Sequence, residues 1–372
     1  MPALNDILQQ KLQLLAAKQQ KRTLKESVRG EGVRVTRAGR ELISFSCNDY
    51  LGLSHHPEVI AAAMDALKKY GAGAGASRLV TGNFPLYDEL ETALATYKNT
   101  EAACVFGSGY LANIGTIPAL VGSGDLILAD KLIHACMVDS ARLSGATFMR
   151  FAHNNMEHCR MLLEANRAEH QHCLILTETI FSMDGDRAPL TALASLAKEF
   201  DSWLMVDGAH EFSAHGKDTP TIQMGTLSKA AGSYGGYICG SKILIDYLKT
   251  ASRSLIYSTG LPPATVAASL AAFKVMAREP GLTEKPLKNA RLFTSLLGLE
   301  PAESAIVPLI LKDNDKALTA SQLLEEKGFL VAAIRPPTVP ENTARLRFAF
   351  SALHTKADIE AVAAIIKSQG WV

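Results

Sequence analysis

The amino-acid sequence predicts an α/β fold in which helices cover both faces of a mostly parallel central sheet. Seven short apolar runs between residues 102 and 240 have the composition of buried strands, and amphipathic stretches separate them. Near-continuous apolar strands that alternate with helices are typical of parallel sheets covered on both faces. A smaller α+β unit is expected at the C-terminal end, where strand-like and helical stretches follow a long Ala-rich helix.

The predicted elements divide the chain into three parts. Residues 1–45 hold a polar helix and a short strand, residues 46–262 a large α/β domain, and residues 263–372 a small α+β domain. Two helices, "HPEVIAAAMDALKKYG" and "LYDELETALATYKN", open the large domain; proline near the start of the first and glycine after its end are boundary signals. The strands of the large domain are predicted at "AACVFG", "DLILAD", "TFMRFA", "CLILTET", "WLMVDGA", "IQMGTL" and "GGYICG".

Composition excludes several classes of protein. The 372 residues carry 38 Lys and Arg against 37 Asp and Glu, a formal net charge of +1, which argues against nucleic acid as the main partner. No apolar run approaches the roughly 20 residues of a membrane helix, and the first residues do not resemble a secretory signal. The six cysteines are scattered without a CxxC pair, which indicates buried thiols instead of disulfides or metal ligands. We therefore expect a cytoplasmic protein with no metal site and no membrane partner.

Two glycine-rich stretches are candidate binding loops. "FGSGYLAN" follows a predicted strand and opens a helix, so that the Ser108 hydroxyl and the N–H groups of Gly109 and Tyr110 could bind a phosphate. Taken alone, a tight turn without a ligand fits this stretch as well. "YGAGAGASRLVTGN" contains a loose GxGxxG/A pattern, but it follows a helix, which argues against a dinucleotide site. A glycine loop shaped around another ligand is the preferred interpretation.

A carboxylate, a histidine and a lysine are the strongest chemical signal. "LMVDGAH" places Asp207 at the end of a strand, where ligands of parallel sheets bind, and His210 three residues later. Nineteen positions beyond His210, Lys229 stands behind the hydroxyls of Thr226 and Ser228. A lysine beside a phosphate site and a buried carboxylate is the arrangement that a Schiff base with pyridoxal phosphate requires. In this interpretation Asp207 pairs with the ring nitrogen, and the two hydroxyls bind the phosphate.

Other polar residues are weaker candidates. His134 follows a strand and could stack on an aromatic ring, or simply begin a helix. Arg345 and Arg347 lie in a C-terminal strand, where one of them could grip a substrate carboxylate through two hydrogen bonds. His153 and His158 lack the helical spacing of a metal site and are interpreted as surface residues.

Taken together, these motifs resemble those of the α-oxoamine synthases, fold-type I pyridoxal-phosphate enzymes that join an amino acid to an acyl thioester with loss of carbon dioxide. The resemblance covers nearly the whole chain and rests on "SFSCNDYLGLS", "SRLVTGN", "FGSGYLAN", "IHA", "TETIFSMDGD", "VDGAH", "TLSKAAG", "YSTGLPP" and "RLRFAFSALHT", in the order of the family. It implies a homodimer with shared active sites. Within the family, the resemblance is greatest to the members that join L-alanine to a pimeloyl group, carried by coenzyme A or a carrier protein, in biotin synthesis.

The resemblance also implies a role for each matching residue. Lys229 would bind the cofactor covalently and remove the α-proton. His134 would stack on the ring, Asp207 would meet its nitrogen, and His210 would approach its phenolic oxygen. The phosphate would be held by Ser108, Gly109, Tyr110 and Thr226, and Ser258 and Thr259 would reach the phosphate of the partner subunit. Glu178 and Ser182 would line the pocket. The substrates would contact Arg347, Asn48 and Arg22. Of the last three, Arg347 and Asn48 are expected at the amino-acid carboxylate and Arg22 at the far end of the acyl chain.

The sequence departs from the family pattern beside Asp207. Gly208 replaces a second aspartate, and Glu211 and Ser213 stand where glycine is usual. If the backbone at the last two positions needs a positive φ, both replacements carry strain. Three alternatives therefore stay open: another α-oxoamine synthase that uses glycine or serine, a catalytically impaired cofactor-binding homologue, and a nicotinamide oxidoreductase based on the loop at residues 71–76.

Overall fold

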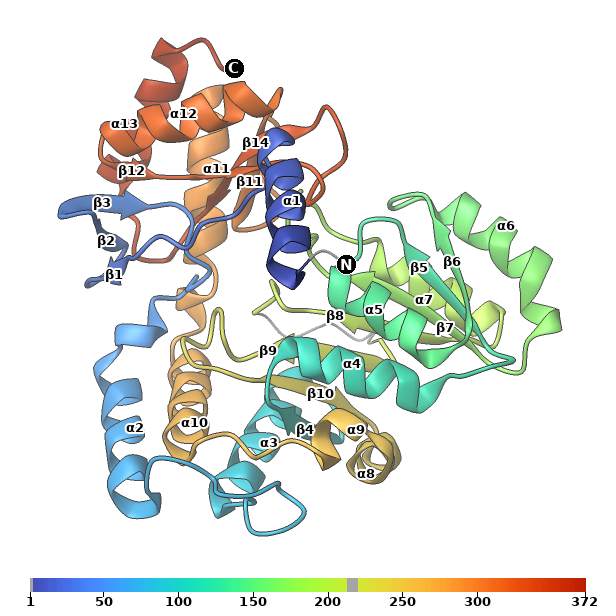
Figure 1. The fold of residues 1–372 in the computed structure, drawn as a ribbon. Helices are drawn as coiled ribbons and strands as arrows, with labels where there is room; N and C mark the ends of the chain where they lie inside the picture. The colour runs from blue at the N-terminus through green and yellow to red at the C-terminus, as the bar shows by residue number, and fades with distance from the viewer. Residues whose placement is uncertain (1–2, 213–219) are drawn as a thin grey trace.

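A seven-stranded sheet forms the centre of the computed structural model, which describes residues 3–212 and 220–372 (Figure 1). The strand order is β4-β10-β9-β8-β7-β5-β6. β10 is antiparallel to both of its neighbours, and the pairs from β9 to β6 are parallel. The strands are β4 (Ala102–Phe106), β5 (Leu126–Asp130), β6 (Thr147–Phe151), β7 (Cys173–Glu178), β8 (Trp203–Asp207), β9 (Ile222–Thr226) and β10 (Gly236–Gly240). The predicted fold class and all seven predicted strands of this sheet are confirmed.

Helices cover both faces of this sheet because successive strand residues point to opposite sides. Ile127 and Ala129 of β5 pack in one apolar cluster, whereas Leu126 and Leu128 pack in another on the opposite face. The first cluster joins α4 (Gly109–Leu120), α5 (Ala135–Ser144), α8 (Lys242–Ala251) and α9 (Arg253–Ile256) to the sheet. The other face is covered by α6 (Met156–Asn166) and α7 (Leu190–Glu199), and towards β4 by α2 (Pro57–Tyr70), α3 (Pro85–Lys98) and α10 (Pro263–Arg278).

The N-terminal strands lie with the C-terminal part of the chain, in the upper part of Figure 1. Strands β1 (Val28–Arg29), β2 (Arg34–Arg37) and β3 (Arg40–Ser44) form a sheet with β12 (Phe329–Leu330), which pairs parallel to β3. A second small sheet contains β11 (Ile306–Lys312), β14 (Ala344–Ala349) and β13 (Ala332–Ile334). Around these sheets lie α11 (Lys285–Leu297), α12 (Asn314–Glu326) and α13 (Lys356–Ser368), and the core is rich in phenylalanine. The boundaries at residues 45 and 262 stay predictions.

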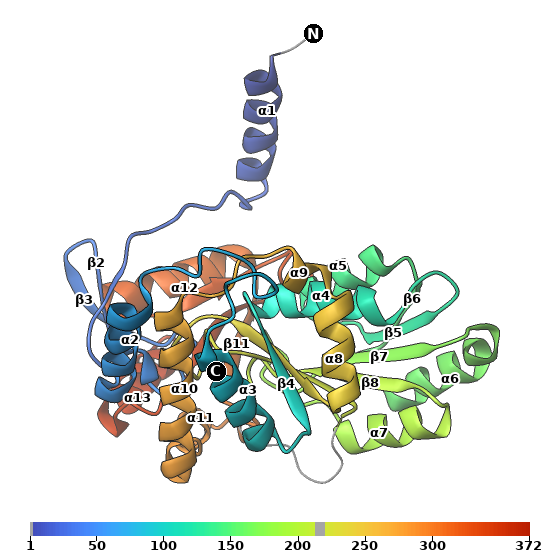
Figure 2. The same cartoon turned by 90° about the horizontal axis from the view of Figure 1, so that it is seen from below.

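The remaining elements are short or peripheral. Single turns of 3-10 helix occur at η1 (Leu53–His55), η2 (Arg167–Glu169) and η3 (Pro280–Leu282). Helix α1 (Leu4–Ala17) buries none of its residues and stands away from the body of the protomer (Figure 2). No helix in the described part of the chain has the length and apolar character needed to span a bilayer.

The parallel strands bring their polar ends to one edge of the sheet. Glu178 at the end of β7 is directly opposite Asp207 at the end of β8. Asp207 is in turn opposite Met224, two residues before Thr226 at the end of β9. The carboxyl edge of such a sheet is where α/β proteins bind ligands. The sheet register therefore places three of the predicted site residues side by side.

Arg78, at the end of the second glycine-rich stretch, has a structural role. Its guanidinium lies over the ring of Tyr87, with Cζ 3.9 Å from the ring centroid, and donates to Glu91 Oε1 at 2.5 Å and to the carbonyl of Val105 at 3.1 Å. Glu91 Oε1 also accepts the N–H of Val105 at 2.8 Å. This buried ion pair fastens the glycine loop and α3 to β4.

We predict that Glu91→Ala lowers the free energy of unfolding by about 3–5 kcal/mol, because it leaves the Arg78 charge buried without its partner. The matched control is Glu199→Ala, which breaks the Arg160–Glu199 pair, whose side chains are 42% and 49% exposed. That change is expected to cost far less, because both side chains are well hydrated. Equal losses for the two variants in denaturant unfolding would contradict the prediction.

Candidate active site

A pocket of about 220 Å³ lies at the carboxyl edge of the central sheet, with Lys229 in its wall. Its lining comes from strand ends and helix starts that are distant in sequence. The lining residues are Ser108, Gly109, Tyr110, His134, Cys136, Glu178, Asp207, Ala209, His210, Met224, Thr226, Ser228 and Lys229. The structure thus brings together most of the residues that the sequence marked as cofactor ligands.

Lys229 is held by a histidine and a tyrosine. Its Nζ lies 2.9 Å from Nε2 of His210, and Nδ1 of His210 lies 2.7 Å from the hydroxyl of Tyr50. Loss of hydration lowers the pKa of Lys229, although the carboxylates of Asp207 and Glu178 act in the opposite direction. Burial, together with the nearby charge of Lys229, holds the pKa of His210 well below its usual value. Burial therefore favours the neutral form of both the Lys229 amine and the His210 imidazole.

Asp207 is a buried carboxylate whose oxygens accept only neutral donors. Oδ1 accepts the N–H of Ala209 at 2.9 Å, and Oδ2 accepts Nδ2 of Asn113 at 2.8 Å. The residue is only 4% exposed, and no ion pair joins it to a cationic side chain among residues 3–212 and 220–372. A buried carboxylate in this state favours a positively charged ligand. The protonated ring nitrogen of pyridoxal phosphate has the charge that this site lacks.

The start of α4 offers an anion site that side chains cannot fill. A Cβ at Gly109 would lie 2.9 Å from Cε of Met224, and one at Gly236 would lie 2.5 Å from the amide nitrogen of Gly109. The amides at the helix start are therefore left bare. Beside them, Oγ1 of Thr226 and Oγ of Ser228 lie 2.7 Å apart. Helix-start amides together with hydroxyls are a chemical match for a phosphate.

Glu178 is a second carboxyl group in the wall, with a different protonation state. It is 2% exposed, and burial and the neighbouring charge of Asp207 raise its pKa well above the usual value. Oε2 accepts the N–H of Ser182 at 3.3 Å, whereas Oε1 has no hydrogen-bond partner in the described structure. A protonated carboxyl with a free oxygen can exchange a hydrogen bond with a ligand in the pocket.

Arg347 approaches the pocket from β14 of the small sheet. Its Nε donates to the carbonyl of Ser182 at 2.6 Å, and Nη1 donates to Oδ1 of Asn48 at 3.2 Å. Asn48 Oδ1 also lies 3.2 Å from the hydroxyl of Tyr50, which contacts His210. Arg347 and Asn48 are thus connected to Lys229 by a short series of contacts, as the sequence predicted for a carboxylate-binding pair.

Comparison with known proteins agrees with this geometry. Residues 40–366 match the family Aminotransferase class I and II. The chain is 53% identical over 370 residues to the 8-amino-7-oxononanoate synthase of Methylobacterium nodulans, covering 99% of this chain and 98% of the relative. The serine palmitoyltransferase of Sphingomonas wittichii superposes with a TM-score of 0.90 at 30% identity, covering 98% of this chain and 96% of that one. An 8-amino-7-oxononanoate synthase from Francisella tularensis gives 0.75 at 27% identity, covering 88% and 98%.

The chain belongs to the α-oxoamine synthases, within the aminotransferase class I and II family. Enzymes of this family depend on pyridoxal phosphate, and the pocket residues fit that cofactor on three grounds. These are the uncompensated carboxylate of Asp207, the bare amides at the start of α4, and the amine of Lys229, whose pKa is lowered by burial.

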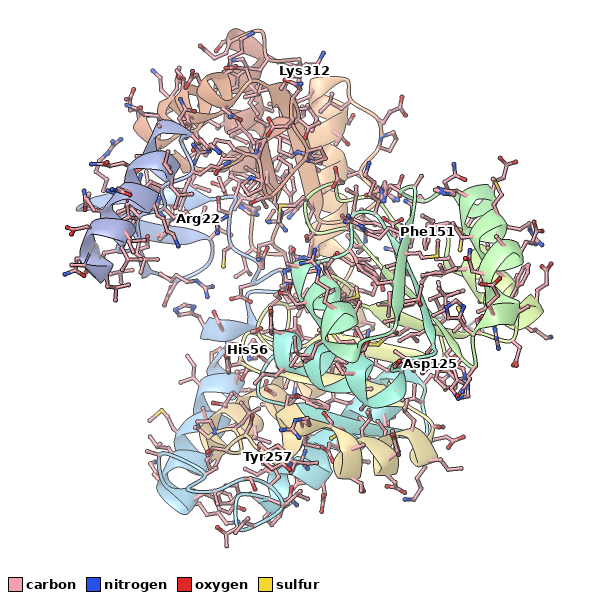
Figure 3. The ribbon with its side chains drawn as sticks, turned by 45° about the vertical axis from the view of Figure 1, so that its right-hand side comes forward. Arg22, His56, Asp125, Phe151, Tyr257 and Lys312 are labelled. Atoms are coloured by element: carbon pink, nitrogen blue, oxygen red, sulfur yellow. The ribbon has the colours of Figure 1, made fainter. Side chains whose placement is uncertain are left out.

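Three predicted residues of this α-oxoamine synthase lie away from the pocket. Ser258 is half-buried and Thr259 is exposed, and Thr259 forms an antiparallel bridge with Ser77. Arg22 is exposed, donates to Oγ1 of Thr338 at 3.5 Å, and lines a separate hollow of about 270 Å³. Figure 3 shows Arg22 beside the C-terminal unit and Tyr257, the neighbour of Ser258, in the lower part of the molecule. Their roles stay predictions.

The expectation of backbone strain at Glu211 is wrong. The φ of neither Gly208 nor Glu211 lies in the positive region. The Glu211 side chain is buried and forms an ion pair with Arg187 at 2.5 Å. This α-oxoamine synthase therefore accommodates a carboxylate in place of the usual glycine by giving it a cation. Ser213 lies outside the described residues.

Three site residues were not singled out from the sequence: Tyr50, Asn113 and Cys136. Each lies in or beside a quoted motif, but nothing in a single sequence distinguishes a polar residue that serves a ligand from one that serves the core. Asn113 lies four residues, or about one helical turn, after Gly109, whose amide faces the pocket. That spacing is the signal that could have identified it.

His153 is not a surface residue, contrary to the expectation from its spacing. Nδ1 lies 2.9 Å from Asp130 Oδ1, and Nε2 lies 2.7 Å from Asp186 Oδ2. Asp186 belongs to the loop that also carries Ser182, the acceptor of Arg347, and Asp184, the acceptor of Arg345 at 2.5 Å. A cationic histidine between two carboxylates therefore fastens the loop beside Arg347.

We predict that His153 makes the stability of this α-oxoamine synthase depend on pH. The two carboxylates raise the pKa of His153 from 6.5 to about 10, against the effect of its partial burial. Because the folded-state pKa is the higher one, the stabilisation is complete below pH 6.5 and is lost as the pH rises through about 10. The difference in unfolding free energy between the wild type and His153→Gln should be largest near pH 6 and small near pH 10.5. A difference that is constant with pH would show that His153 is neutral in the folded state.

Proposed function

We propose that this α-oxoamine synthase joins L-alanine to a pimeloyl thioester, with release of carbon dioxide and the carrier thiol, to form 8-amino-7-oxononanoate in biotin biosynthesis. The observation that carries the proposal is the 53% identity, over 99% of the chain, to an 8-amino-7-oxononanoate synthase, combined with a pocket that fits pyridoxal phosphate. The thioester is carried by coenzyme A or by an acyl carrier protein. The enzyme acts in the cytoplasm as a homodimer.

Different residues of the pocket bind different parts of the cofactor. Ser108, Gly109 and Tyr110 at the start of α4 bind its phosphate, together with the hydroxyls of Thr226 and Ser228. Asp207 holds the ring nitrogen, His134 lies against the ring face, and His210 lies near the phenolic oxygen; Glu178 and Ser182 complete the wall. When bound, pyridoxal phosphate supplies an electron sink for the negative charge that develops on the α-carbon of the amino acid.

The homodimer accounts for the two predicted phosphate ligands that lie outside the pocket of their own protomer. Ser258 and Thr259 follow α9 on an accessible segment, so that they can reach the phosphate bound by the partner subunit. Each active site then takes residues from both copies.

Lys229 is the base that moves the α-proton. A lysine can accept a proton only as a neutral amine, and loss of hydration lowers the pKa of this one. His210, at 2.9 Å, fixes the position of the amine, and Tyr50 fixes the histidine in turn. The low dielectric of the pocket strengthens these interactions and keeps water from the reacting carbon.

Arg347 orients the amino acid by its carboxylate. The guanidinium has five N–H donors, of which Ser182 and Asn48 take two. The remaining donors include both hydrogens of Nη2, which can join Nη1 in a two-bond grip on a carboxylate. Holding the carboxylate in this way also places the bond that later breaks to release carbon dioxide.

We predict that the purified, cofactor-loaded protein releases thiol from pimeloyl-CoA with L-alanine, and much less with glycine or L-serine. Lys229→Ala should abolish release, because Lys229 supplies the amine among the described residues that line the pocket. Faster release with glycine or serine would assign the chain to another α-oxoamine synthase activity. Normal cofactor absorbance without release from any of the three amino acids would indicate an impaired homologue, and a Glu211→Gly variant would then show whether that departure is the cause.

We also predict that Arg347→Lys raises the KM for L-alanine by about 10-fold to 100-fold, because an ammonium group cannot reproduce the two-bond grip. The KM for pimeloyl-CoA should change much less. The matched control is Arg345→Lys, since Arg345 lies two residues away on the same strand but donates to Asp184 and the carbonyl of Met183. Equal KM changes for the two variants would mean that Arg347 supports only the loop.

A further inference from the structure

A continuous series of hydrogen bonds joins Asp207 to His134 beneath the pocket. Nδ2 of Asn113 donates both to Oδ2 of Asp207 at 2.8 Å and to Sγ of Cys136 at 3.1 Å. Sγ of Cys136 lies 2.9 Å from Nδ1 of His134. Asn113 is fully buried and Cys136 is 2% exposed, so that water does not compete for the bonds of Asn113, whereas His134 at the end of the series is exposed. Two helices meet here, with Asn113 on α4 and Cys136 in the first turn of α5.

The direction of each bond is fixed by the donors available. The carboxylate of Asp207 accepts at both oxygens, so the amide of Asn113 must turn its NH₂ group toward it. The amide oxygen of Asn113 points elsewhere and has no hydrogen-bond partner in the described structure. Burial raises the pKa of Cys136 to about 12, so that its thiol keeps its proton. Because Sγ already accepts from Asn113, the S–H is free to donate to Nδ1 of His134.

The bonds at His134 select one form of its ring. Nδ1 accepts from the thiol of Cys136 and, at 3.3 Å, from the backbone N–H of the same residue. A nitrogen that accepts from two donors carries no proton, so the neutral ring carries its proton on Nε2. The bonds also prevent rotation of the ring about χ2, which fixes the plane that faces the pocket.

We propose that Asn113 and Cys136 are positioning residues that set the orientation of the Asp207 carboxylate and the tautomer of His134 through one continuous hydrogen-bond chain. The proposal rests on the cofactor site of the proposed function, in which Asp207 meets the edge of the ring and His134 its face. One chain would then position two of the residues that hold the cofactor ring. Neither Asn113 nor Cys136 needs to take part in the chemistry.

The first test reads the histidine tautomer in the protein before cofactor is added. Four variants are compared with the wild type by ¹⁵N NMR of histidine-labelled protein: Asn113→Ala, Cys136→Ala, Cys136→Ser and the control Cys159→Ala. Cys159 is likewise fully buried, but it packs in the apolar cluster beneath α6, far from this chain. A His134→Gln variant identifies the His134 signals.

We expect the wild type, Cys136→Ser and Cys159→Ala to hold the proton of His134 on Nε2. Cys136→Ala and Asn113→Ala should instead give a mixture of tautomers, because the thiol donor is removed in the first and loses its orienting partner in the second. A serine hydroxyl can both accept and donate, and its rescue separates hydrogen bonding from packing. Unchanged tautomers in both alanine variants would overturn the proposal. Near-ultraviolet circular dichroism verifies that each variant is folded, and the two alanine sites provide independent tests.

The second test titrates pyridoxal phosphate into the same proteins. Loss of one buried hydrogen bond should weaken binding about fivefold to tenfold in Asn113→Ala and Cys136→Ala, with little change in Cys136→Ser or Cys159→Ala. Equal affinity in all variants would overturn the positioning role even if the tautomer changed. If the wild type binds no cofactor while the tautomers behave as expected, the proposed function fails and the hydrogen-bond chain at His134 stands.

Discussion

The pocket of this α-oxoamine synthase depends on the burial of ionisable side chains at the carboxyl edge of the central sheet. Asp207 and Glu178 lie at the ends of neighbouring strands, almost fully buried, and Lys229 faces them across the pocket. Loss of hydration lowers the pKa of the lysine and raises that of Glu178. Burial at this edge therefore favours the uncharged form of both side chains. His210 and Tyr50 hold the lysine in place, and Asn113 holds the carboxylate of Asp207.

The fold supplies this arrangement because parallel strands end at one edge and helices begin there. The same register that aligns Asp207 with Glu178 brings the start of α4 and the end of β9 to the pocket. Glycine is required where backbones approach closely: a Cβ at Gly236 would meet the amide of Gly109. Strand β14 of the small sheet also contributes to this region. Its residues Arg345 and Arg347 donate to Asp184 and to the carbonyl of Ser182, both in the loop after β7. That loop is fastened from its other side by His153. The position of Arg347 thus depends on contacts between three separate parts of the chain.

Much of the site was predictable because its chemistry needs particular residue types at strand ends and helix starts. A lysine among small residues and hydroxyls, an aspartate closing an apolar strand and a glycine turn before a helix each carry a local signal. Asn113, Cys136 and His153 carry no such signal, since an asparagine inside a helix or a histidine in a loop is usually unremarkable in a sequence. At Glu211, by contrast, the sequence did give a signal, but the structure contradicts its interpretation. Its departure from the family pattern suggested backbone strain, but an arginine 24 residues earlier gives its carboxylate a partner.

By itself, the sequence determined the fold class, the strands of the central sheet and the cofactor, and it singled out most of the residues that line the pocket. These follow from local periodicity and from motifs in which residue type and spacing carry the chemistry. Only the tertiary structure decided which residues contact one another. It determined that Asn113 donates to Asp207, that two carboxylates bind His153, and which strand the N-terminal strands pair with. Strand β3 pairs with β12 some 290 residues later, and no local pattern encodes that choice. The physical reason is that burial and hydrogen bonding are properties of neighbours in space, and they set the protonation states on which the chemistry depends.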